Sequence, residues 1–75
     1  MKNKLAAIEG ILFSMGTSVT RRQLMEALEI DNEQFDELIK LLQTEYDKEE
    51  RGIRLLELDD AYQLCTKTEY YGSLI

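Results

Sequence analysis

The stretch from residue 31 to residue 46 constrains the fold more than any other part of this sequence. Its apolar side chains recur at intervals of three and four, at Phe35, Leu38, Ile39, Leu42 and Tyr46. This spacing places them along one face of an α-helix of about four turns. Asp31 precedes Gln34 by three positions, the capping-box spacing that satisfies two backbone amides at a helix start. The stretch is therefore predicted to be a helix with a defined beginning and one buried face.

A first helix is predicted over residues 5–15. The residues that share its apolar face are Leu5, Ile8, Ile11, Leu12 and Met15. Gly16 follows where a left-handed helix cap is expected, and residues 17–20 are predicted as a short connection. Gly10 within the helix indicates either a close approach of another backbone or a tolerated loss of helix propensity.

The second helix is short and is predicted from Arg21 to Leu28. Thr20 and Gln23 repeat the capping-box spacing at its start. Arg21 and Arg22 lie in its first turn, where the helix dipole disfavours cations. We interpret this pair as solvated surface residues, with a contact to an anion or a partner as the alternative.

The pattern changes from helical to extended after the third helix. Residues 53–58 and 62–66 are predicted as two antiparallel strands, with Asp59 and Asp60 in the turn between them. The order of helix, short turn, helix and hairpin is that of a winged helix-turn-helix. Residues 1–75 are thus predicted to form one domain with three helices, a two-stranded antiparallel wing and, over residues 69–75, the start of a C-terminal helix.

The register of the hairpin depends on the length of its turn. A three-residue loop would pair Leu58 with Tyr62, whereas a two-residue loop would pair Leu55 with Leu64. The sequence does not decide between these two registers. Either register leaves apolar side chains on both faces, which indicates that a second protein surface covers one of them. The alternative is that the C-terminal segment folds back over it. The residues predicted to contact a second copy or a partner are Leu55, Leu56, Leu58 and Tyr62, with the first helix next.

The charge pattern argues against nucleic acid as a direct partner. The third helix occupies the recognition position, yet its polar face carries carboxylates and one cation, Lys40, and the net charge of the chain is -6. Affinity for a phosphate backbone comes from Lys and Arg side chains. The carboxylates of this helix would instead repel the DNA phosphates. The hypothesis is therefore a domain that contacts proteins, and the competing hypothesis is a winged-helix transcriptional regulator that reads DNA. A third and least favoured hypothesis is a structural module of a larger enzyme.

The residues for enzyme chemistry are missing from the sequence. It contains no histidine, no phosphate-binding glycine loop and a single cysteine, Cys65, which is interpreted as a packing residue. We therefore expect no enzyme activity, no cofactor and no metal site. No stretch has the roughly 20 apolar residues of a membrane span, and the start lacks a signal sequence, so a cytoplasmic protein without a membrane partner is expected.

The chain also resembles the N-terminal domain of segregation and condensation protein B, the winged-helix subunit of the bacterial condensin complex. The matching positions are 8–13, Gly16, Leu24, 27–30, 51–55, 62–67 and 69–70. Three short segments at this separation are fairly specific for the family: Arg51-Gly52-Ile53, Tyr62-Gln63-Leu64 and Thr66-Lys67. The family has a second winged-helix domain that this sequence lacks.

The resemblance implies a homodimer that binds the kleisin subunit, segregation and condensation protein A. Through the kleisin it would reach the condensin ATPase during chromosome segregation at the nucleoid. In the family, much of the kleisin contact is attributed to the second domain. This sequence is therefore expected to be the N-terminal dimerisation half of a two-domain protein.

Overall fold

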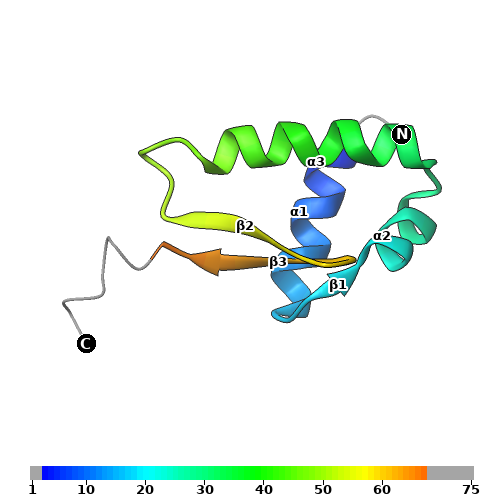
Figure 1. Ribbon diagram of the computed structural model, residues 1–75, viewed down its shortest axis with the longest axis horizontal. Helices are drawn as coiled ribbons and strands as arrows, with labels where there is room; N and C mark the ends of the chain where they lie inside the picture. Colours follow the sequence, from blue (N-terminus) through cyan, green and yellow to red (C-terminus); the bar gives the residue numbers. More distant parts are fainter. Residues whose placement is uncertain (1–2, 68–75) are drawn as a thin grey trace.

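The computed structural model describes residues 3–67 as three helices and a small sheet (Figure 1). The order of elements confirms the predicted winged helix-turn-helix, and the C-terminal helix predicted over residues 69–75 lies outside the described residues. The elements are α1 (Lys4–Met15), β1 (Val19–Thr20), α2 (Arg21–Leu28), α3 (Asn32–Tyr46), β2 (Ile53–Leu58) and β3 (Ala61–Thr66).

The helix starts follow the capping signals of the sequence. The Asp31 side chain accepts a hydrogen bond from the Gln34 backbone at 2.8 Å, and the Gln34 side chain accepts one from the Asp31 backbone at 3.1 Å. Thr20 and Gln23 form the same reciprocal pair before α2. Gly16 ends α1 in the left-handed conformation, with φ of 69°. These contacts satisfy amides and carbonyls that a helix end leaves without partners.

The sheet has one strand more than the predicted two-stranded wing. Its order is β1-β3-β2, and Val19 pairs with Tyr62 in the added contact. Residues 17–20 are therefore not wholly a connection, because the last two extend the sheet. Two residues are too short to show an alternating pattern, and this explains why the sequence did not predict the strand.

The hairpin takes the two-residue turn. Leu55 pairs with Leu64 and Leu58 with Ala61, so β3 begins one residue earlier than predicted. Asp59 opens the turn with a φ of 43°, a positive value of the kind that tight hairpin turns require. This register turns Ile53 and Leu55 toward the helices and Leu56 and Leu58 away from them.

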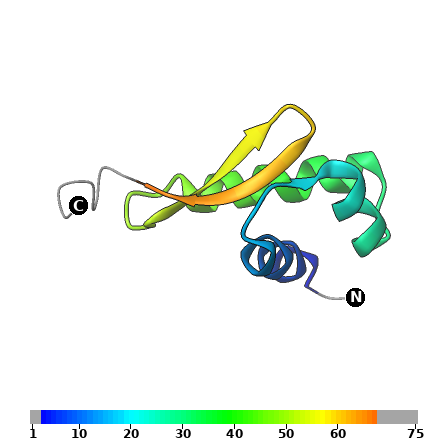
Figure 2. The ribbon, with the colours of Figure 1, turned by 90° about the horizontal axis from the view of Figure 1, so that it is seen from below.

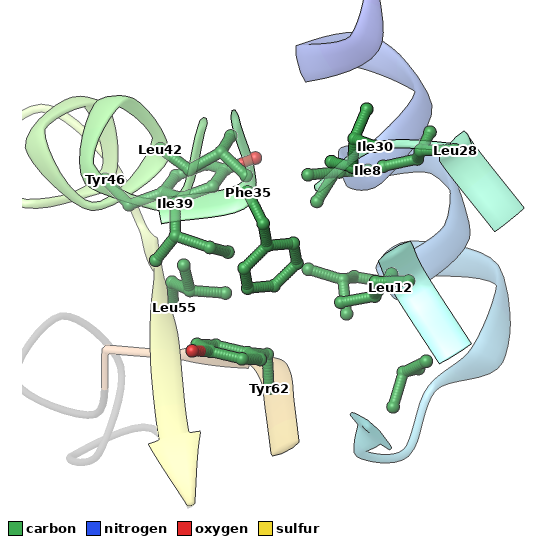
Figure 3. Packing of buried hydrophobic residues seen from close by; sticks show 12 residues of the cluster. Ile8, Leu12, Leu28, Ile30, Phe35, Ile39, Leu42, Tyr46, Leu55 and Tyr62 are labelled. Carbon is green, nitrogen blue, oxygen red and sulfur yellow. The ribbon is translucent and has the colours of Figure 1, made fainter. Parts of the chain in front are cut away.

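The core lies between α3, α1 and the inner face of the sheet (Figure 3). Phe35 is fully buried at its centre, with its ring edge-on to Tyr62 at a centroid distance of 5.4 Å. Ile8 and Leu12 bring α1 onto this cluster, as its spacing predicts, whereas Met15 is exposed beyond it. In Figure 2 the outer face of the hairpin carries no other element of the described residues.

Candidate protein-contact surfaces

Helix α3, which would read DNA in a winged-helix regulator, presents carboxylates. Glu33, Glu37 and Asp47 are exposed along or just after it, and Lys40 is its one cation. Asp36 is also exposed and lies 2.8 Å from the Arg21 guanidinium. Because phosphate binding needs cations on this helix, its surface suits a protein partner better than DNA.

Arg21 differs from the predicted solvated surface residue. Its Nε and one terminal nitrogen donate to the Asn32 side chain at 3.1 and 3.0 Å, and the latter nitrogen also donates to Asp36. The Asp36 hydrogen bond is the main reason why the pKa of Arg21 is raised. Arg21 thus joins α2 to α3. Arg22 matches the prediction, since it is exposed and lies 3.6 Å from the Glu26 carboxylate.

The four residues predicted as wing contacts divide between the two faces of the sheet. Leu55 and Tyr62 are buried in the core of the domain, so a second protein cannot cover them in the folded chain. Leu56 is half-buried and Leu58 is 43% exposed, on the outer face. The division follows from strand alternation, which the sequence showed without indicating which face the helices would cover. Leu56 and Leu58 are the part of the set that stays accessible.

Helix α1 carries an exposed aromatic side chain that was not among the predicted contact residues. Phe13 is 79% exposed, the largest value among the exposed large hydrophobic residues of the described chain. Its position outside the apolar stripe of the helix is the signal that could have identified it, since an aromatic residue on the polar side of an amphipathic helix has no core to enter. Phe13 marks a second apolar surface besides the wing.

Two adjoining hollows separate Phe13 from the hairpin. One, of about 330 Å³, is lined by Ala6, Glu9, Gly10, Phe13, Ile53 and Leu64. The other, of about 210 Å³, shares Phe13, Ile53 and Leu64 and continues toward Gly16 and Thr66. A Cβ added at Gly10 would meet no atom within 4 Å, so no other backbone of the described chain approaches this glycine closely. Gly10 instead leaves open space at the surface.

Charged groups border the opposite flank of α1. A hollow of about 440 Å³ lies there between α1 and the end of α3, and Leu41, Glu45 and Arg51 help to line it. The Tyr46 hydroxyl donates to the Glu9 carboxylate. Burial, followed by this hydrogen bond, raises the pKa of Tyr46.

The described residues offer no site for a metal. Across residues 3–67 no three His, Cys, Asp or Glu side chains lie close enough together to hold an ion. Cys65 is a free, half-buried thiol. None of the helices in this part of the chain is long and apolar enough to cross a bilayer.

The fold and these surfaces define a winged-helix domain of the protein-contacting kind. The family model described as "Segregation and condensation complex subunit ScpB" matches residues 6–74, and the chain belongs to this family. The family is that of a subunit of a complex, and no enzyme activity is indicated for it.

Individual relatives agree with the family assignment. The chain is 36% identical over its whole length to segregation and condensation protein B of Lachnoclostridium phytofermentans, and 44% identical over 91% of its length to that of Caldanaerobacter subterraneus subsp. tengcongensis. It spans 40% of the length of each of these curated relatives.

A solved structure resembles the whole domain. It is a crystal structure of a dimer of the ScpB N-terminal domain complexed with a ScpA peptide. The TM-score is 0.87 and the identity is 33%, with 100% of this chain and 94% of that chain covered.

Proposed function

We propose that this chain is a non-catalytic adaptor domain of the bacterial chromosome condensation complex, which self-associates and binds the kleisin subunit, ScpA. The observation that carries the proposal is the similarity, over nearly all of both chains, to an ScpB N-terminal domain whose crystal structure is a dimer with a ScpA peptide. Through ScpA the domain would reach the condensin ATPase and act in chromosome segregation, in the cytoplasm at the nucleoid.

The surface of this chain supports contacts with proteins. Phe13 on α1 and Leu58 on β2 expose apolar area on two separate parts of the domain. Exposed apolar patches on a small domain mark sites of association. We propose the outer face of the wing, at Leu56 and Leu58, as one contact surface for a second copy or for the kleisin.

The test is to mix this chain with the ScpA protein encoded by the same genome and measure the mass of the complex by size-exclusion chromatography with light scattering. We expect one species that contains ScpA and two copies of this domain. Separate elution of the two proteins at concentrations well above those of the cell would contradict the kleisin contact.

A double variant, Leu56→Glu with Leu58→Glu, tests the wing in the same assay. Loss of ScpA from the complex, with helix content unchanged by circular dichroism, is expected if the wing is the partner surface. Glu57→Lys is the matched control, because it changes a charge on the same strand and leaves both leucines in place. Equal ScpA binding by all three proteins would remove the wing from this contact.

A further inference from the structure

We infer that the free edge of β2 accepts an added β-strand from a partner protein. The strand is an extended segment with apolar residues at alternate positions and a carboxylate in line with them. The inference rests on the wing contact proposed above, and it adds the backbone groups that make the contact and the chemistry of the segment. The occupant is a different polypeptide and not a second copy of this chain.

The first observation is the position of β2 in the sheet. In the order β1-β3-β2 the central strand is β3, so β2 has a neighbouring strand on one side only. Figure 2 shows β2 along the outer margin of the hairpin. Helix α3 packs against the inner face of β2, where Leu55 is buried. A strand at the margin of a sheet offers its outward backbone groups to another strand.

The two-residue turn determines which backbone groups of β2 point outward. Leu58 and Ala61 flank the turn, so they form a hydrogen-bonded pair, and bonded pairs then recur at every second position of the ladder. The bond from the Lys67 N–H to the Gly52 carbonyl, at 2.8 Å, fits this alternation. The positions between the bonded pairs therefore direct their N–H and C=O groups away from β3.

Three residues of β2 have such outward groups: Ile53, Leu55 and Glu57. Within residues 3–67, no other element forms a hydrogen bond with the backbone of these three residues. The strand also lacks the features that protect sheet edges, since it is six residues long, pairs with β3 without a bulge and contains no proline or lysine. Strand β2 is therefore free to pair with a further strand.

The outer face of the hairpin gives the added strand its side-chain preference. The strand residues that share this face are Arg54, Leu56, Leu58, Ala61, Gln63 and Cys65, and none of them is acidic. Leu58 is 43% exposed. Apolar side chains of an added strand would extend this surface, because same-face neighbours on adjacent strands contact one another.

Arg54 is the charged group that selects the segment. It is exposed and forms no ion pair or hydrogen bond within residues 3–67, whereas the other three arginines of the chain each pair with a carboxylate. In a chain with a net charge of -6, this leaves a cation on an apolar face without carboxylates. The complementary segment has apolar residues opposite Leu58 and Leu56 and a carboxylate opposite Arg54, each two positions apart.

The experiment is a titration of the isotope-labelled whole chain with two synthetic peptides, followed by backbone amide NMR. One peptide is Thr-Val-Thr-Val-Thr-Glu-Thr, for an antiparallel strand, and the other is its reverse, for a parallel strand. We expect one of them to shift the amides of Ile53, Leu55 and Glu57 most. A control peptide with Lys in place of Glu should bind at least about threefold more weakly.

Two variants separate the backbone contact from the charge contact. Glu57→Pro removes an outward amide donor, and Glu57→Ala is the matched control because it removes the same side chain and keeps the amide. We expect the peptide Kd of Glu57→Pro to exceed that of Glu57→Ala about fivefold. Arg54→Glu, which keeps every backbone amide, should raise the Kd at least about threefold, and it tests the inference if the spectrum of Glu57→Pro shows an opened hairpin.

The contrary outcomes are distinct. Equal binding of the peptide by Glu57→Pro and Glu57→Ala overturns strand addition, and so does the absence of any amide shift at millimolar peptide. Shifts that gather on α1 or α3 also overturn the inference, because they assign the peptide to another surface. Shifts at the β2 amides when the chain alone is concentrated would assign the edge to a second copy. A chain that binds ScpA but neither peptide loses this inference and keeps the proposed function.

Discussion

The Arg21 guanidinium lies 4.6 Å from the centroid of the Phe35 ring, at the junction of the second and third helices. Phe35 is fully buried, so the charge covers the outer side of the core, and Asp36 holds the same guanidinium at 2.8 Å. A residue in the first turn of α2 thereby links α2 to α3, although its charge opposes the helix dipole.

Removing this contact is expected to destabilise the domain. Arg21→Ala should lower the free energy of unfolding by about 1–2 kcal/mol, because it removes a cation–π contact and hydrogen bonds to Asn32 and Asp36. Arg22→Ala, at an exposed position, should change it by less than about 0.5 kcal/mol. Urea titration followed by circular dichroism measures both. Equal effects of the two variants would mean that the contacts of Arg21 with Phe35, Asn32 and Asp36 together add nothing measurable to stability.

Glu29 ends α2 in the left-handed conformation, with φ of 56°, which costs energy for a residue with a side chain. Glu29→Gly should therefore raise the free energy of unfolding by about 0.5–1 kcal/mol. Glu26→Gly is the control, because the same change inside α2 should lower it by about 1 kcal/mol. A thermal melt of each variant checks the opposite signs, and destabilisation by both would contradict the strain at Glu29.

Tyr46 should make the domain sensitive to alkali. Burial and the hydrogen bond to Glu9 raise its pKa in the folded chain. Below pH of about 10 both the folded and unfolded states keep the proton, and the stabilisation is complete. Above that pH the unfolded chain ionises first, so stability falls as pH rises. Urea midpoints measured at pH 8 and above should fall less for Tyr46→Phe than for the parent.

Glu45 should make the domain sensitive to acid. Its pKa is lowered by hydrogen bonds from Lys48 and then Arg51. A carboxylate with a lowered pKa stabilises the fold above its unfolded pKa of about 4.3, and this contribution is lost as pH falls further. The difference between urea midpoints at pH 7 and pH 3.5 should shrink in Glu45→Gln. An unchanged difference would mean that these exposed ion pairs do not contribute to folding.

The acidic surface predicts very weak binding to DNA. A gel shift with random duplex at low ionic strength should show no complex, because α3 presents Glu33 and Glu37 where a reader of DNA needs cations. Reversal of Glu33 and Glu37 to Lys provides the comparison and should gain salt-sensitive binding. Tight binding by the parent would favour the competing regulator hypothesis.

The helices could be predicted from the sequence because each signal is local. The pairs Asp31 with Gln34 and Thr20 with Gln23 lie within one helical turn, and the buried residues of α3 repeat with its period. The hairpin was less determined, because Leu55 and Leu56 are equally apolar neighbours on opposite faces. Which of them is buried depends on where α1 and α3 pack, and this is set by tertiary contacts.

The candidate contact surface was harder to predict for the same reason. From the sequence alone, Tyr62 is predicted to be an accessible aromatic residue of the wing. In the structure its ring packs against Phe35. The sequence places Phe13 in a helix but does not show that the core forms without it. Exposure of a single side chain is a property of the whole fold, so spacing along one element cannot assign it.

Lys67 gives the domain a mechanical property. At the open end of the hairpin its backbone N–H donates to the Gly52 carbonyl at 2.8 Å, and its ammonium donates to the Lys48 carbonyl at 3.0 Å. A force that pulls on the chain beyond Thr66 loads these two bonds before any bond of the hairpin ladder. Lys67 thus ties the end of β3 to the loop before β2 through two separate carbonyls.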